Sequence, residues 1–243
     1  MSNLVVTVTP ERAWLTQDRA TWHQDTSKPG LVWHPEPRGE VPKVRAFPDR
    51  HMLVGGVGLA YPVALWGEAC VDRLGPGDVT DTAEQTADEL QAFIRWRDGD
   101  LSDLPADVDE SVVKAIQHNM PYMTAMRIWH VGWSRSEGRC LAYLFDLDNG
   151  FRPQRVETKH GMEPAPCESA PGFKHLVRYS EQAERGQRVP RFHRAMLENQ
   201  GHAMRTGAIG WVAYPSDTFD TGVVDANGVR VEGPFSLDGK AAA

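Results

Sequence analysis

The side chains that most often carry chemistry in proteins are scattered along this chain. Its nine histidines form no pair with metal-site spacing, and His193 and His202 lie too far apart to share a helix face. The cysteines, Cys70, Cys140 and Cys167, are odd in number and never in C-x-x-C spacing, which favours a reducing compartment without a zinc site. Nucleophile-elbow, phosphate-loop, dinucleotide and zinc-protease motifs are absent. We therefore expect no metal and no cofactor.

Composition narrows the class of protein. The 243 residues include 26 Lys or Arg and 33 Asp or Glu, a net charge of −7 without a basic run, which argues against nucleic-acid binding. Apolar stretches such as Met52–Tyr61 fall far short of the ~20 residues of a membrane helix. No basic and apolar leader precedes the first strand. We expect a cytoplasmic globular protein that binds neither nucleic acid nor membrane.

The elements that must position any site are expected in blocks. A β-branched run predicts a strand at 4–8, and 12–17 would return beside it as a hairpin. Further strands are expected at 43–47, 52–57, 125–133, 139–147, 208–215, 222–224 and 229–232. Helices are expected at 59–74, 109–119, 173–185 and 191–205, and another begins near Thr80 or Asp81, with Glu84 in a capping-box position. Strands in groups favour antiparallel sheets.

Two stretches show no such periodicity. The Pro-rich stretch 22–41 is too long for an ordinary connection and is expected to be a functional loop or an insertion. The stretch 153–172 holds four prolines and is expected to be irregular. A frayed tail is expected at 236–243.

Three segments in the first 150 residues, taken in order, resemble one family. Ser2–Thr21, S-N-L-V-V-T-V-T-P-E-R-A-W-L-T-Q-D-R-A-T, is similar to the start of proteasome β subunits and of bacterial HslV-type peptidases. Lys43–Pro62 resembles the family's catalytic-lysine strand, hairpin and glycine turn into a helix. Val131–Gly150 resembles its long sheet hairpin. The resemblance is good over about the first hundred residues and weak after Gly150, which favours the less-studied, Anbu-like bacterial branches.

The resemblance implies a fold and an activity. The fold would be the N-terminal nucleophile (Ntn) hydrolase fold, a four-layer αββα sandwich of two antiparallel sheets flanked by helices, as a single domain over residues 1–243. The activity would be hydrolysis of peptide bonds in peptides or unfolded proteins. Family members assemble as rings, so a homo-oligomer is implied, and an ATP-dependent unfoldase is a possible partner.

The resemblance also assigns residues to catalytic roles. Removal of Met1 would expose Ser2 as the nucleophile, with its own α-amino group as the base, because such an amine titrates near neutral pH. Lys43 would supply positive charge, and Asp18, sixteen residues after Ser2 as in the family, would hold Lys43 in place. The backbone N–H of Gly58 would face the oxyanion.

Other positions are implied to bind substrate or to support the amine. Thr21 would line the cleft and pair with the substrate backbone, and Gly56 would border a roomy pocket for the residue before the scissile bond. Ser169 is the nearest counterpart of a family serine that supports the amine, and it is a weak candidate.

Alternatives stay open at this stage. Alignment of the R-A-T run without a gap places Met1 at the nucleophile position and Gln17 at the Asp position, which would give an inactive site. A chain that retains Met1 would serve as a structural or assembly subunit of the same fold. The third alternative is a small-molecule amidase of the wider Ntn superfamily.

Overall fold

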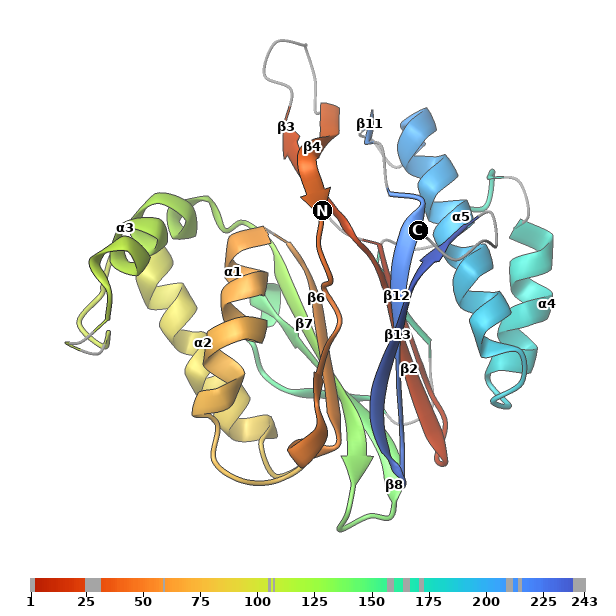
Figure 1. Cartoon of the computed structure of the whole chain (residues 1–243), viewed down its shortest axis with the longest axis horizontal. Coiled ribbons are helices and arrows are strands. Elements are labelled where there is room, and N and C mark those ends of the chain that lie inside the picture. Colours follow the sequence, from red (N-terminus) through yellow and green to blue (C-terminus); the bar gives the residue numbers. More distant parts are fainter. Residues whose placement is uncertain are drawn as a thin grey trace.

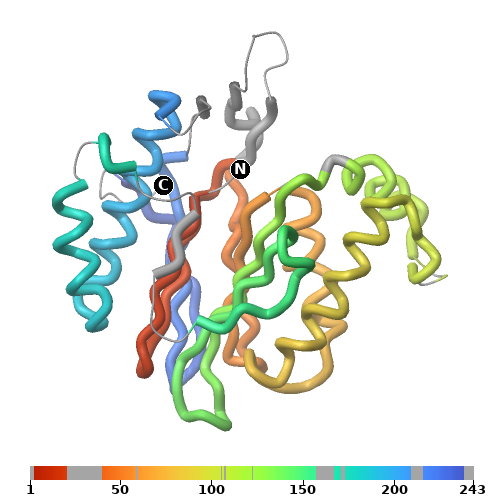
Figure 2. The backbone as a smooth tube through the Cα atoms, turned by 180° about the vertical axis from the view of Figure 1, so that it is seen from behind, coloured from red at the N-terminus to blue at the C-terminus, as the bar shows by residue number. Residues whose placement is uncertain are grey.

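The structure, a computed structural model, has four layers (Figure 1). It describes residues 3–24, 32–58, 60–104, 106, 108–156, 160–163, 167–170, 173–208, 212–213 and 216–237. Two five-stranded antiparallel sheets face each other, and a layer of helices covers the outer face of each sheet. The same order of layers is seen from behind in Figure 2. This mixed α and β architecture agrees with the antiparallel sheets expected from the grouping of strands.

The first sheet contains the start of the described chain. Its strand order is β10 (His160–Glu163), β1 (Leu4–Val8), β2 (Arg12–Asp18), β12 (Thr218–Asp225) and β13 (Gly228–Ser236). The predicted hairpin of β1 and β2 is confirmed, with Leu4 opposite Gln17, and its turn is closed by a 2.8 Å hydrogen bond from Thr9 Oγ1 to the carbonyl of Arg12. Strand β1 lies inside the sheet, between β10 and β2.

The second sheet is built from the middle of the chain. Its order is β5 (Arg45–Phe47), β6 (Met52–Gly58), β7 (Met126–Ser134), β8 (Arg139–Asp146) and β9 (Gln154–Val156). Strand β5 is short and pairs with β6 only from Met52 to Val54. The remainder of β6, residues 55–58, is paired with β7 on its other side.

Helices cover both sheets. Helices α1 (Ala60–Leu65) and α2 (Ala83–Arg97) pack on the second sheet, and α3 (Glu110–Asn119) lies against α2 in the same layer. Helices α4 (Phe173–Ala183) and α5 (Val189–Thr206) pack on the first sheet. Three apolar cores fill the spaces between the four layers, represented by Phe93, Leu15 and Phe192. Burial of these cores is the main favourable contribution to folding. No helix in the described part of the chain combines the length and the apolar character that crossing a bilayer requires.

A third, small sheet corrects the prediction for residues 22–41. Strands β3 (Ala20–Gln24) and β4 (Val32–Glu40) form an antiparallel pair, and β11 (Val212–Ala213) adds to β4 in parallel. The expected Pro-rich loop is therefore wrong for the described part of this stretch. Proline is compatible with β4 because, in the described part of the chain, Pro35 and Pro37 lie beyond the two residues that pair with β11.

Other local predictions need correction. Residues 153–172 are not wholly irregular, since β9 and β10 form there. The N-cap of α2 is Thr82, and Asp81 instead accepts a 3.0 Å hydrogen bond from the backbone N–H of Asp78. Lys43 precedes β5 and is not part of a strand. The tail beyond residue 237 lies outside the described residues.

A buried histidine joins the second sheet to its helices. His130 on β7 is fully buried, and its Nε2 accepts a 2.9 Å hydrogen bond from the indole N–H of Trp66. This contact requires a neutral ring protonated at Nδ1, and Nδ1 lies 3.5 Å from Thr86 Oγ1. Burial, with a smaller contribution from the positive charge of Arg50, lowers the pKa of His130 from 6.5 to about 3.

This pKa predicts a loss of stability in acid. Between pH 6.5 and about 3 the unfolded chain binds a proton at His130 that the folded chain does not, so the free energy of unfolding should fall by about 1.4 kcal/mol for each pH unit. Above pH 6.5 His130 is neutral in both the folded and the unfolded chain, so this loss of stability is absent. Urea unfolding of the wild-type protein and of His130→Gln at several pH values measures the difference, and equal slopes for the two proteins would contradict the assignment.

Candidate active site

The beginning of β1 is fixed by a carboxylate at the end of β2. The N–H of Asn3 donates a 2.8 Å hydrogen bond to Asp18 Oδ1, and the N–H of Asp18 donates one of 3.0 Å to the carbonyl of Asn3. Asp18 is only 2% exposed, and its Oδ2 has no hydrogen-bond partner in the described structure. The hairpin register produces this contact, because Leu4 lies opposite Gln17 and the next residues outward are Asn3 and Asp18.

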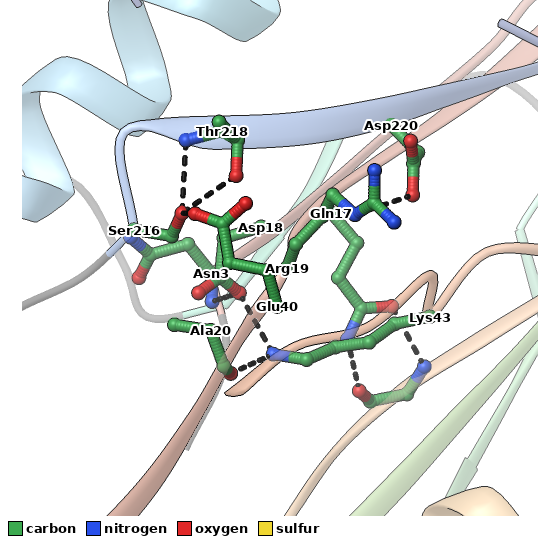
Figure 3. Close-up of polar contacts among 11 residues, drawn as sticks. Asn3, Gln17, Asp18, Arg19, Ala20, Glu40, Lys43, Ser216, Thr218 and Asp220 are labelled. Carbon is green, nitrogen blue, oxygen red and sulfur yellow. Dashed lines mark hydrogen bonds and ion pairs between the residues drawn. The ribbon is translucent and has the colours of Figure 1, made fainter. Parts of the chain in front are cut away.

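Lys43 reaches the same carboxylate from the segment between β4 and β5. Its Nζ lies 3.3 Å from Asp18 Oδ1 and also donates a hydrogen bond to the carbonyl of Ala20 (Figure 3). The Lys43 side chain is 12% exposed. The structure thus brings together two of the residues that the sequence assigned to one site, from positions 25 residues apart.

Burial and ion pairing act on this pair in opposite directions. Burial raises the pKa of Asp18, and the charge of Lys43 and the hydrogen bond from Asn3 lower it in part. Burial likewise lowers the pKa of Lys43, against the attraction of Asp18. Each charge is therefore stable in this site only because the other is beside it. A buried ammonium of this kind can stabilise negative charge on a neighbouring oxygen.

Two of the three glycines of β6, Gly56 and Gly58, were also assigned to the site. Gly58 has a φ of +136°, and a Cβ there would be 2.5 Å from the carbonyl oxygen of Ala125, so only glycine fits. A Cβ on Gly56 would be 2.7 Å from the Arg127 carbonyl oxygen and 2.8 Å from Ile128 Cδ1. A side chain at position 56 therefore has no room in this direction, and the pocket that the resemblance implies beside Gly56 stays a prediction.

A second group of charges adjoins the site and was missed by sequence reasoning. Arg19 Nε lies 3.7 Å from Asp220 Oδ2, and Glu40 accepts a 2.6 Å hydrogen bond from Ser216 Oγ, which is itself 2.7 Å from Thr218 Oγ1 (Figure 3). Burial raises the pKa of Asp220. The pKa of Glu40 is low because the hydrogen bonds from Ser216 and Thr218 outweigh burial, which raises it.

No sequence signal joins these residues, because their partners are far apart along the chain. Strand β12 pairs with β2 at the Phe219 and Asp18 register, and the N–H of Arg19 donates to the Thr218 carbonyl at 3.1 Å. That pairing brings a segment some two hundred residues away to the end of β2.

The remaining predicted residues have other positions. Ser2 and Met1 lie outside the described residues. Thr21 belongs to β3 by its backbone, and its side chain is not described. Ser169 lies between β10 and α4, with its hydroxyl 3.2 Å from Cys167 Sγ. The side-chain amide of Gln17 contacts the backbone of Gly56.

Neither a search for metal-ligand clusters nor comparison with known proteins assigns a role to any further residue. No group of three or more His, Cys, Asp or Glu among the described residues is arranged to hold a metal ion. No family model matches the sequence, and no curated protein matches it significantly.

The coupling of Asp18 and Lys43 gives a stability prediction. Lys43→Met leaves the Asp18 charge buried without a partner and should lower the free energy of unfolding at pH 7 by about 3–5 kcal/mol. The double variant Asp18→Asn with Lys43→Met should recover most of this loss, because no isolated charge remains. Urea unfolding of the single and double variants measures the coupling.

A matched control is the exposed ion pair of Arg45 and Glu68. Arg45→Met should cost less than about 1 kcal/mol, because an exposed pair is screened by solvent. The coupling is contradicted if Lys43→Met costs no more than Arg45→Met.

Proposed function

We propose that this chain is a proteasome-like N-terminal nucleophile hydrolase that cleaves peptide bonds with Ser2 after removal of Met1. The observation that carries the proposal is the contact of the Asn3 N–H with Asp18, on the same carboxylate oxygen that binds Lys43. The nitrogen of Asn3 is bonded to residue 2. A serine hydroxyl and an α-amino group at residue 2 would then belong to the residue next to a buried ammonium and carboxylate.

The arrangement of the layers supports the same proposal. Two facing antiparallel sheets between helix layers, with the opening strand β1 inside a sheet, are what the Ntn-hydrolase fold requires. The choice between the two alignment registers is supported too, because Asp18 contacts Lys43 whereas Gln17 has a different partner.

The proposed reaction has two stages. In the first, the Ser2 hydroxyl attacks a peptide carbonyl, and its proton passes, through a water, to the α-amine and then to the leaving amine as the C–N bond breaks. In the second, water hydrolyses the resulting ester and regenerates Ser2.

The surrounding groups assist both stages. Lys43 holds the α-amine neutral and stabilises the developing alkoxide, and Asp18 fixes Lys43. Gly58 lies two residues after Gly56 on β6, so its N–H lies on the same strand edge, where it would donate to the oxyanion. Thr21 would pair with the substrate backbone.

The mass of the intact chain and its activity on fluorogenic peptides together test this function. We expect the mass to lack one methionine and the wild-type protein to release fluorophore, with a rate that rises with pH as the α-amine loses its proton near pH 7.7–8.0 or below. Ser2→Ala should abolish release, and Lys43→Met should lower kcat at least about 100-fold. Ser102→Ala, an exposed serine beyond α2, is the matched control and should keep full activity.

Each of the other outcomes would indicate a different function for this chain. A retained Met1 without activity would indicate a structural or assembly subunit. Methionine loss without peptide cleavage, but with Ser2-dependent hydrolysis of small amides, would indicate an amidase. Peptide cleavage that survives Ser2→Ala excludes the proposed nucleophile.

A further inference from the structure

A buried side-chain amide connects the two sheets next to the candidate site. Gln17 on β2 is 1% exposed, and its Nε2 donates a 2.6 Å hydrogen bond to the carbonyl of Gly56 on β6. The N–H of Gly56 donates back to Gln17 Oε1 at 3.3 Å. Both backbone polar groups of Gly56 are thus satisfied by a side chain from the opposite sheet.

The need for this amide follows from the length of β5. Alternate residues of a strand direct their N–H and C=O to the same edge, so Val54, Gly56 and Gly58 share one edge of β6. Arg45 pairs with Val54, and β5 begins there. Continuation of the register would place Lys43 opposite Gly56, but Lys43 turns to Asp18 instead. Gln17 therefore takes the place of a strand residue at Gly56.

The packing around the Gln17 amide requires a glycine at position 55. A Cβ on Gly55 would lie 2.9 Å from Gln17 Oε1 and 2.9 Å from Leu15 Cδ2. Glycine at position 55 thus lets β2 approach β6 closely enough for the two hydrogen bonds. The surroundings are the apolar core between the sheets, which includes Leu53 and Trp129, so an unsatisfied backbone group there would be costly.

We propose that Gln17 is a positioning residue for the proposed reaction, because it sets the distance between the strand that holds Asp18 and the strand that carries Gly58. Gln17 adjoins Asp18 in sequence, and its partner Gly56 is two residues from Gly58. The amide thus links the carboxylate and ammonium at Asp18 to the proposed oxyanion donor at Gly58 through Gln17, Gly56 and Val57. It acts on the transition state and leaves substrate binding unchanged, so it affects kcat and not KM.

The inference rests on the proposed function, and its test uses two substitutions at position 17. Gln17→Met keeps the volume without either hydrogen bond, and we expect kcat on a fluorogenic peptide to fall about 10- to 100-fold with KM within about twofold. Gln17→Glu keeps the acceptor for the Gly56 N–H and regains the donor when its buried carboxyl is protonated. Its activity relative to wild type should therefore rise as the pH is lowered, whereas that of Gln17→Met should not change with pH.

Thr82→Val is the matched control for general destabilisation. Thr82 is fully buried in the helix layer of the second sheet, and its hydroxyl donates a 2.9 Å hydrogen bond to the Asp78 carbonyl. This variant should lose stability but keep kcat. If Gln17→Met and Thr82→Val lower kcat equally at equal loss of stability, Gln17 has only a structural role and the proposal is overturned.

Amide hydrogen exchange separates failure of this inference from failure of the proposed function. Exchange at Gly56 and Gly58 should be faster in Gln17→Met than in the wild-type protein, whether or not the protein cleaves peptides. An inactive wild-type protein with this change in exchange overturns the function but supports the connection between the sheets. Unchanged exchange at both glycines overturns the role of Gln17.

Discussion

The cost of removing charge from water governs the region around the start of β1. Asp18 and Lys43 are both nearly inaccessible, and neither charge would be tolerated in this place alone. Their pairing requires that β1 and β2 end in register and that the chain before β5 turn toward β2. Asn3 and Ala20 supply the additional hydrogen bonds that make the buried pair tolerable. An ion pair on the surface would need none of these constraints, which is why we propose this pair as part of the active site.

The parts of the fold that sequence predicted correctly are those with local patterns. The alternating and β-branched residues around Val6 and the helical spacing around Leu90 reflect burial on one face of a single element. The hairpin of β1 and β2 needs only its own turn. Two predictions failed for different reasons. Strand β4 holds prolines, which indicated a loop, yet it pairs with the neighbouring strand β3. Strand β10 forms because β1, more than 150 residues earlier, offers it an edge.

In the candidate site, too, some residues could be predicted from the sequence and others could not. Asp18 and Lys43 were assigned through resemblance to a family, and the structure brings them together. The charged group around Arg19 and Asp220 and the amide of Gln17 left no signal, because each contact joins residues from different sheets or distant strands. The tight packing at the Cβ position of Gly56 could not be predicted either, since it depends on which neighbour packs there and not on glycine itself.

The amide that crosses between the sheets also restricts how the two halves of the molecule can assemble. Apolar contacts between facing sheets are not directional. An interface of leucine and valine alone would let one sheet shift relative to the other at a small cost in free energy. A shift by one residue pair would leave the side-chain amide of Gln17 and the backbone of Gly56 buried without hydrogen-bond partners. Each unsatisfied group would cost roughly 1–3 kcal/mol of stability. Apolar burial holds the two sheets together, and the two hydrogen bonds between Gln17 and Gly56 help to select their alignment.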